Sequence, residues 1–95
     1  MLSTQYNDRV LYLEGDLQVH HLASIKAEMI TWAADKAPLT LDLSQVVEVD
    51  LAGLQMVVSF LRSRKNETKV IGVASKLNKA LDITGLAPHF VEFLD

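Results

Sequence analysis

Residues 46–61, VVEVDLAGLQMVVSFL, decide how the rest of the chain is interpreted. The stretch opens with β-branched residues that favour a strand, and it then changes to the spacing of a helix. Asp50 stands at this change, and Asp is a favoured N-cap because its side-chain oxygen accepts from the free N–H groups of the first turn. The apolar residues that follow fall at i, i+3, i+4 and i+7, which predicts one buried stripe. They are Leu54, Val57, Val58 and Leu61.

Gly53 falls in the first turn of this predicted helix. The absence of a Cβ there lets another backbone or a partner approach closely, and we expect a steric requirement beside the loop that holds Asp16. The start of a helix also carries partial positive charge and unpaired donors. It is therefore the natural place on this chain for an anion, a phosphoryl group or a partner protein. Leu51 stays open between a core role and an interface role.

The composition predicts one soluble domain, residues 1–95, that folds without disulfides or structural metals. The chain is 49% hydrophobic, has no cysteine and carries a formal net charge of -3. Disulfides and thiolate metal sites are thus excluded, and the lack of a basic stripe argues against nucleic-acid binding. The first residues show no signal-peptide pattern. The longest apolar-rich stretch, 51–61, is too short for a membrane span. We expect a cytoplasmic protein.

The elements before the central stretch are predicted from local patterns. Asn7 and Asp8 mark a turn between two short strands, at 2–6 and 10–13, and so predict an N-terminal hairpin. Apolar spacing predicts an amphipathic helix over 19–34. Alternation in LTLDL predicts a strand at 39–43, followed by a turn at Ser44 and Gln45.

The elements after it complete an α/β pattern. We expect the central helix to run to about residue 65, with Arg62 and Arg64 near its negative end. KVIGVA, at 69–74, has the length and apolarity of a central strand buried on both faces. A short helix at 76–83 follows, capped by Ser75 and ended by Gly85. Phe90, Val91 and Phe93 suggest a last strand. The order β-β-α-β-α-β-α-β predicts a mostly parallel sheet with helices packed on it.

Three motifs in this order resemble the STAS domain family, which includes anti-sigma-factor antagonists and cytoplasmic domains of sulfate transporters. They are Asp-Leu-Ser at 42–44, Asp-Leu-Ala-Gly-Leu at 50–54 and Thr-Gly-Leu at 84–86. The resemblance covers nearly the whole chain, about 10–93. EVDLAGLQ and the preceding LEGDLQ are most similar to small single-domain bacterial members found with chemotaxis or lipid-transport systems.

The resemblance implies a phosphorylation switch that this chain does not carry in the usual place. In regulated members, a partner kinase phosphorylates a Ser or Thr at the start of the helix. The matching positions here are Leu51 and Ala52, and neither has a hydroxyl group. Phosphorylation at the family position is therefore chemically impossible in this sequence. The departure places the switch in doubt while leaving the fold intact.

The leading hypothesis is a non-catalytic module that docks a protein partner. The partner would be an anti-sigma or serine-kinase-like protein, a chemotaxis protein or a transporter component. The residues proposed to meet it lie at the helix start and in the adjacent loops. They are Asp16, Ser44, Asp50, Leu51, Ala52, Gly53 and Gln55.

Other hypotheses stay open. The chain could be a phospho-switched antagonist that uses another hydroxyl, Ser44 before Ser59, or a transporter-associated subunit. Nucleotide binding has only the helix start to support it, and a homodimer is possible. We expect no cofactor and no metal, because the adjacent His20 and His21 point apart and lack a third ligand at a recognised spacing. Nothing supplies a nucleophile with a suitable base, so we expect no enzyme.

Overall fold

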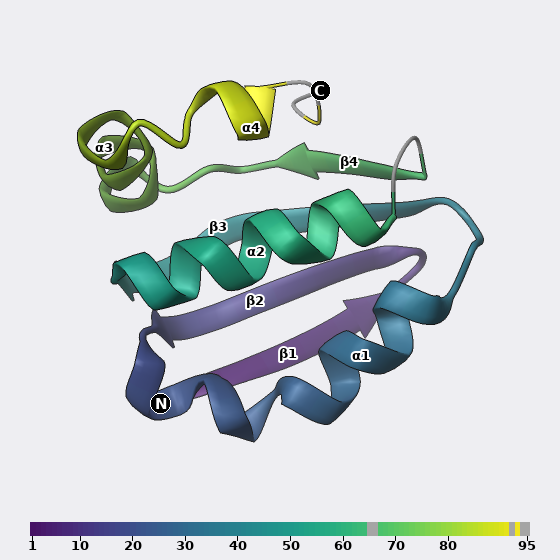
Figure 1. Ribbon diagram of the computed structural model, residues 1–95. Helices are drawn as coiled ribbons and strands as arrows, with labels where there is room; N and C mark the ends of the chain where they lie inside the picture. The colour runs from purple at the N-terminus through teal and green to yellow at the C-terminus, as the bar shows by residue number, and fades with distance from the viewer. Residues whose placement is uncertain (65–66, 92, 94–95) are drawn as a thin grey trace.

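The computed structural model describes residues 1–64, 67–91 and 93. Within them strands and helices are interspersed along the chain, as Figure 1 shows. The elements in order are β1 (Leu2–Asn7), β2 (Val10–Leu17), the 3₁₀ helix η1 (Val19–Ser24), α1 (Lys26–Ala34), β3 (Leu39–Val49), α2 (Leu51–Ser63), β4 (Thr68–Ile71), α3 (Ser75–Thr84) and α4 (Pro88–Val91).

The described strands form one sheet in the order β1-β2-β3-β4. β1 and β2 pair antiparallel, whereas β2–β3 and β3–β4 pair parallel. The predicted N-terminal hairpin is thus confirmed. Asp8 and Arg9 turn its corner with φ of 51° and 64°. Two successive left-handed residues match the right-handed twist of a tight hairpin.

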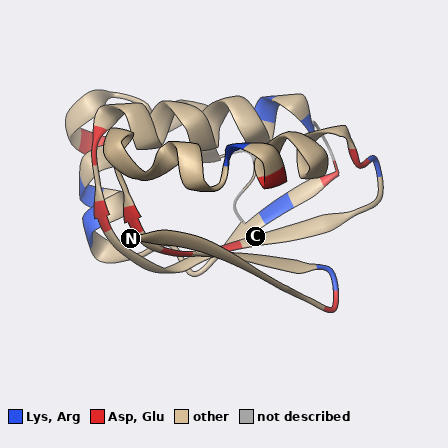
Figure 2. Ribbon diagram, turned by 90° about the horizontal axis from the view of Figure 1, so that it is seen from below, with Lys and Arg blue, Asp and Glu red and all other residues tan. Residues whose placement is uncertain are grey.

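The core lies between the sheet and the helices α1 and α2, which lie on one side of the sheet in Figure 2. Leu11 and Leu13 of β2 and Leu41 and Leu43 of β3 are fully buried and point to the same face. Residues two apart on a strand share a face, so these four form the floor of the core. The predicted stripe of α2 packs on this floor and is buried, with Leu54, Val57 and Leu61 at 0% exposure and Val58 at 6%.

The predicted helix over 19–34 is broken into η1 and α1. The break falls at Ile25, whose backbone leaves helical geometry at φ -116° and ψ 1°. The Ser24 hydroxyl donates to the carbonyl of Leu2 and to that of His21, so the junction is tied to the first residue of β1. Ile25 itself is buried, at 2% exposure. The apolar spacing predicted the burial of Ile25 and Met29 but not the exposure of Ile30, which is 59% exposed.

The predicted turn at Ser44 and Gln45 is wrong, because β3 continues through it. The pairing with β2 slips twice, between Tyr12 and Glu14 and between Gly15 and Asp16. At each slip β3 carries one extra residue, which makes a β-bulge and bends the strand. Val47 lies in the second bulge and is 57% exposed.

β4 differs from the predicted central strand. It spans Thr68–Ile71, stands last in the sheet order and exposes Lys69. Gly72 ends it with a φ of 63°. The backbone N–H of Val70 donates to the carbonyl of Phe93, at 2.7 Å. The free side of β4 is thus covered in part by the chain that follows α4.

The predicted last strand is also wrong, because Phe90 and Val91 belong to the helix α4. Phe90 and Phe93 are buried, at 1% and 6%, while Val91 is 61% exposed. Burial three residues apart suits a helical turn, whereas a strand would bury alternate residues. Further along, α3 is capped by Ala74 without a side-chain bond, so the predicted Ser75 cap is wrong as well. Gly85 ends α3 in the left-handed region, as predicted.

Arg64 lies at the end of α2, as predicted, and its side chain is buried. α2 ends at Ser63, and Lys65 lies outside the described residues. The Arg64 side chain is 1% exposed and donates to the carbonyls of Trp32, Asp35 and Ala37 and to the hydroxyl of Thr68. Burial lowers its pKa. One guanidinium thus holds the end of α1 and the loop to β3 against the end of α2.

Candidate docking surface at the start of helix α2

Asp50 fixes the start of α2 from two sides. One carboxylate oxygen accepts from the backbone N–H of Gly53, at 2.9 Å, and the other from that of Val19, also at 2.9 Å. The predicted N-cap is therefore confirmed, and the same side chain also ties α2 to the first residue of η1. The Val19 bond is the main cause that lowers the pKa of Asp50, with the Gly53 bond and nearby His20 acting in the same direction. The group is ionised at neutral pH and rigidly held.

Gly53 brings α2 into close contact with the end of β2. A Cβ at this position would lie 1.9 Å from the carbonyl oxygen of Leu17. Real Cβ atoms do not approach a backbone oxygen so closely, so the steric requirement predicted beside Asp16 is confirmed. The Asp50 backbone N–H donates to the same Leu17 oxygen, at 3.1 Å. Gly53 is buried and positions the surface instead of presenting a contact.

Leu51 lies outside the core. Its side chain is 51% exposed, and Val19, joined to it through Asp50, is 55% exposed. Gln55, one turn further along α2, is exposed, and Ala52 is partly buried. Of the two roles left open for Leu51, its exposure excludes the core role. We call Asp16, Val19, Leu51, Ala52 and Gln55 the docking surface.

Asp16 borders this surface at the end of β2. Its side chain is 31% exposed and accepts from the ammonium group of Met1, at 2.9 Å. Its backbone N–H donates to the Met1 carbonyl, at 2.8 Å. The hydrogen bond from the ammonium group is the main cause that lowers the pKa of Asp16. Asp16 is therefore a charged, already partnered edge of the docking surface.

Ser44 is the predicted site residue that the fold places elsewhere. It precedes Val49 by five residues on β3, about 16 Å at the usual rise of a strand. Its backbone N–H and hydroxyl both donate to one oxygen of Asp42, at 2.8 and 2.6 Å. A Cβ on Gly72 would lie 2.9 Å from the Cβ of Ser44. Ser44 thus lies beside the segment after β4, apart from the start of α2.

Val19 is a candidate contact residue that sequence reasoning missed. It was assigned only as the first residue of a helix, whereas it is 55% exposed and its N–H donates to a carboxylate 31 positions away. No local pattern signals such a bond. A second missed feature is the ion pair between Lys76 of α3 and Glu48 of β3, which lies on the strand just before Asp50.

Two further kinds of feature, a metal site and a membrane-spanning helix, were sought in the described part of the chain. No group of three or more His, Asp or Glu side chains in it is arranged to hold a metal ion. None of its helices combines the length and apolarity needed to cross a membrane.

The arrangement described above, a hairpin followed by parallel strands and a capped α2, is that of an α/β interaction domain of the STAS type. Comparison identifies the family directly. Residues 1–92 match the family described as "Mlab, STAS domain", and the chain belongs to this STAS family. No curated protein matches the chain.

Two solved structures share the fold. An anti-sigma factor antagonist from Mycobacterium paratuberculosis has 21% identity and a TM-score of 0.69, over 95% of this chain and 81% of that one. The anti-sigma factor antagonist SpoIIAA in its unphosphorylated form has 15% identity and a TM-score of 0.61, over 87% of this chain and 83% of that one. The α/β fold with a mostly parallel sheet is thus established.

Proposed function

We propose that this chain is a non-catalytic regulatory module of the anti-sigma-factor-antagonist type that binds a protein partner through the docking surface. We further propose that it acts in the cytoplasm as a single domain of residues 1–95. Two similar structures carry the name anti-sigma factor antagonist, which supports a partner of the anti-sigma or serine-kinase type. A chemotaxis protein or a transporter component would use the same surface.

The observation that carries the proposal is Leu51, half exposed at the first position of a rigidly held helix. An apolar side chain gains free energy when a partner removes it from water. Because Asp50 already fixes α2 to η1, little conformational freedom remains to be lost on binding. Val19 extends the apolar contact, and Gln55 and Asp16 supply a polar rim.

The docking surface is proposed to work without a phosphate switch. Leu51 and Ala52 have no hydroxyl group to accept a phosphoryl group. A partner would instead be released through its own changes or through its concentration. The side chains present support this proposal, under which the module is constitutively competent to bind.

Ser44 is the alternative acceptor, and its surroundings disfavour it. Its hydroxyl already donates to Asp42, so phosphorylation would break that bond and place a phosphate beside a carboxylate. Like charges this close repel one another. Intact-mass analysis after incubation with a partner kinase and ATP tests this point: we expect no added phosphate, and one phosphate on Ser44 would restore the switched alternative.

The main experiment compares capture of partners by three forms of the chain. Wild type, Leu51→Asp and Val91→Asp are immobilised and exposed to lysate of the source organism, and bound proteins are identified by mass spectrometry. Val91 is a matched control, because it is 61% exposed on α4 and outside the docking surface. We expect a partner that binds wild type and Val91→Asp but is lost with Leu51→Asp.

The outcomes separate the possibilities. A partner that Leu51→Asp retains at full level would show that the interface lies elsewhere. The identity of a lost partner decides among an anti-sigma protein, a chemotaxis protein and a transporter component. A second copy of the chain, detected by light scattering of wild type and absent in Leu51→Asp, would make the docking surface a homodimer interface.

A further inference from the structure

A groove runs between α1 and α2 on the helical side of the molecule, beyond the docking surface. Its volume is about 450 Å³, and its walls come from η1, α1 and α2. Small-molecule sites hold about 300–1,000 Å³ and are lined mostly by apolar side chains with a few polar groups. The groove has the size and the lining of such a site.

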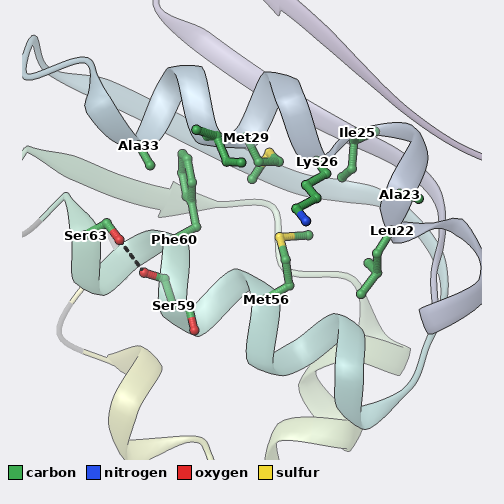
Figure 3. Close-up of a pocket in the computed structure, with 11 residues that line it drawn as sticks. Leu22, Ala23, Ile25, Lys26, Met29, Ala33, Met56, Ser59, Phe60 and Ser63 are labelled. Carbon is green, nitrogen blue, oxygen red and sulfur yellow. Dashed lines mark hydrogen bonds between the residues drawn. The ribbon is translucent and has the colours of Figure 1, made fainter.

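The walls are apolar on both sides. Ile25, Met29 and Phe60 are buried at the bottom, while Ile30 is 59% exposed at the rim. Figure 3 shows Met29 on α1 and Met56 on α2, on the two helices that flank the groove. Methionine is flexible and polarisable, so it adapts to chains of differing shape. α1 has nine residues, which gives the groove a length of roughly 13 Å.

One charge faces this apolar surface. Figure 3 shows Lys26 extending from α1 toward Met56. Within the described residues, no hydrogen bond or ion pair holds its ammonium group. None of the described groove residues is acidic, and Glu28, the acid of the first turn of α1, accepts instead from the hydroxyl of Thr4.

The backbone adds to the positive charge. Lys26 is the first residue of α1, whose N-terminus receives no side-chain cap. The N-terminal end of a helix carries partial positive charge that favours an anion. An apolar groove with an unpaired cation at an uncapped helix start complements a molecule that has an apolar chain and one anionic head.

We propose that the groove between α1 and α2 binds a single-chain fatty carboxylate, with its chain against Met29, Met56 and Phe60 and its carboxylate on Lys26. The proposal does not depend on partner docking at Leu51. A protein helix, which would need an acidic side chain to meet Lys26, is the competing occupant.

Titration with three probes tests the chemistry. Decanoate below its micellar concentration carries the chain and the anion, decylamine carries the chain with the opposite charge, and acetate carries the anion alone. Calorimetry should show decanoate binding roughly tenfold more tightly than decylamine, since hydrogen bonds to charged groups favour the matched ion. Acetate should not bind. Equal affinity for decanoate and decylamine would overturn the role of Lys26.

Variants locate the site. Lys26→Glu should reverse the preference, so that decylamine binds more tightly than decanoate, whereas the matched charge reversal Lys79→Glu on exposed α3 should change nothing. Ser59→Trp, which fills the groove from an exposed position, should abolish both interactions while circular dichroism stays unchanged. Decanoate binding that survives Ser59→Trp would place the site elsewhere.

Amide chemical shifts give an independent readout. Decanoate should move signals of residues 22–33 and 56–63, and Leu51→Asp should leave that titration unchanged. Loss of partner capture in Leu51→Asp with unchanged decanoate binding separates the two proposals. No shift with decanoate at millimolar concentration would overturn the proposal and leave the groove to a protein helix.

Discussion

At each end of the sheet, one charged side chain binds backbone groups. The two ends differ in the exposure of the side chains around that group. At the carboxyl ends of β2 and β3, the Asp50 carboxylate accepts from Val19 and Gly53 while Leu51 points into solvent. At the opposite end, the Arg64 guanidinium donates to four carbonyls, those of Trp32, Asp35, Ala37 and Glu67, and is itself buried.

The surroundings sharpen the contrast. Near Arg64, the rings of Tyr6 and Trp32 stack with centroids 4.4 Å apart, and the guanidinium of Arg9 lies 5.9 Å from each. The side chains at that end pack against one another, and Nη2 of Arg9 is buried there without a hydrogen-bond partner among the described residues. The Asp50 end leaves apolar groups without a partner inside the chain. The difference teaches that the Arg64 end stabilises the fold, whereas the Asp50 end also presents exposed apolar side chains. Substitution of Arg64 should therefore lower stability, and substitution of Leu51 should change binding more than stability.

The largest loss of stability is expected at Arg64. Arg64→Ala should lower the free energy of unfolding by about 4 kcal/mol, because the carbonyls of Trp32, Asp35 and Ala37 lose a buried donor together. Arg64→Lys keeps the charge but not the planar fork, and should recover only part of the loss. Urea denaturation followed by circular dichroism measures both. A loss below 1 kcal/mol for Arg64→Ala would remove the claim that this end anchors the fold.

Gly53→Ala should follow, with a loss of about 3 kcal/mol, because the new methyl group meets the backbone oxygen of Leu17. Gly85→Ala is the matched comparison. No atom lies within 4 Å of a Cβ there, so only its φ of 74° opposes the change, at about 1 kcal/mol. If thermal and urea unfolding rank the two variants in the reverse order, the close approach of α2 to β2 is not what Gly53 provides.

Asp50→Ala should cost about 1–2 kcal/mol, the usual range for a lost N-cap. The pKa of Asp50 is lowered in the folded chain. Its contribution is therefore present above the ordinary aspartate pKa, near 3.9, and is lost as pH falls through the lower folded value. The difference between wild type and Asp50→Ala should accordingly shrink in strong acid. A difference that is independent of pH would show that the charge is not involved.

Leu51→Asp should have the smallest effect on stability, within about 0.5 kcal/mol, since the residue is exposed and an acid at a helix start is favourable. Leu51→Asp would then lose partner binding while keeping its stability, whereas Arg64→Ala loses stability. A stability loss of several kcal/mol would instead mean that Leu51 packs in solution, and the two ends would no longer differ in kind.

The features that the sequence predicted well are those that local chemistry determines. Asp50 caps α2 because an acidic side chain next to free N–H groups needs nothing distant, and Gly85 ends α3 for an equally local reason. The turn signal at Asn7 and Asp8 predicted the hairpin, although the turn lies one residue later, at Asp8 and Arg9. The spacing of Leu54, Val57 and Leu61 predicted the buried face of α2.

The features that it missed depend on partners far along the chain. Arg64 was predicted to lie near the end of α2, but its hydrogen bonds were missed, because no local pattern shows that it donates to carbonyls about 30 positions earlier. The bond from the Val19 N–H to Asp50 was missed for the same reason. Within the candidate site, the residues around Asp50 were predicted together and lie together, whereas Ser44 was included for its motif and lies apart.

The bond between Val70 and Phe93 has a consequence for how copies of this chain meet. An edge strand with free N–H groups invites another strand to extend the sheet. β4 has four residues, its Val70 N–H is already bound to the Phe93 carbonyl, and Lys69 is exposed on it. A second copy that adds a strand at β4 must break that bond before it can form its own, so sheet extension at this edge begins with an energetic loss.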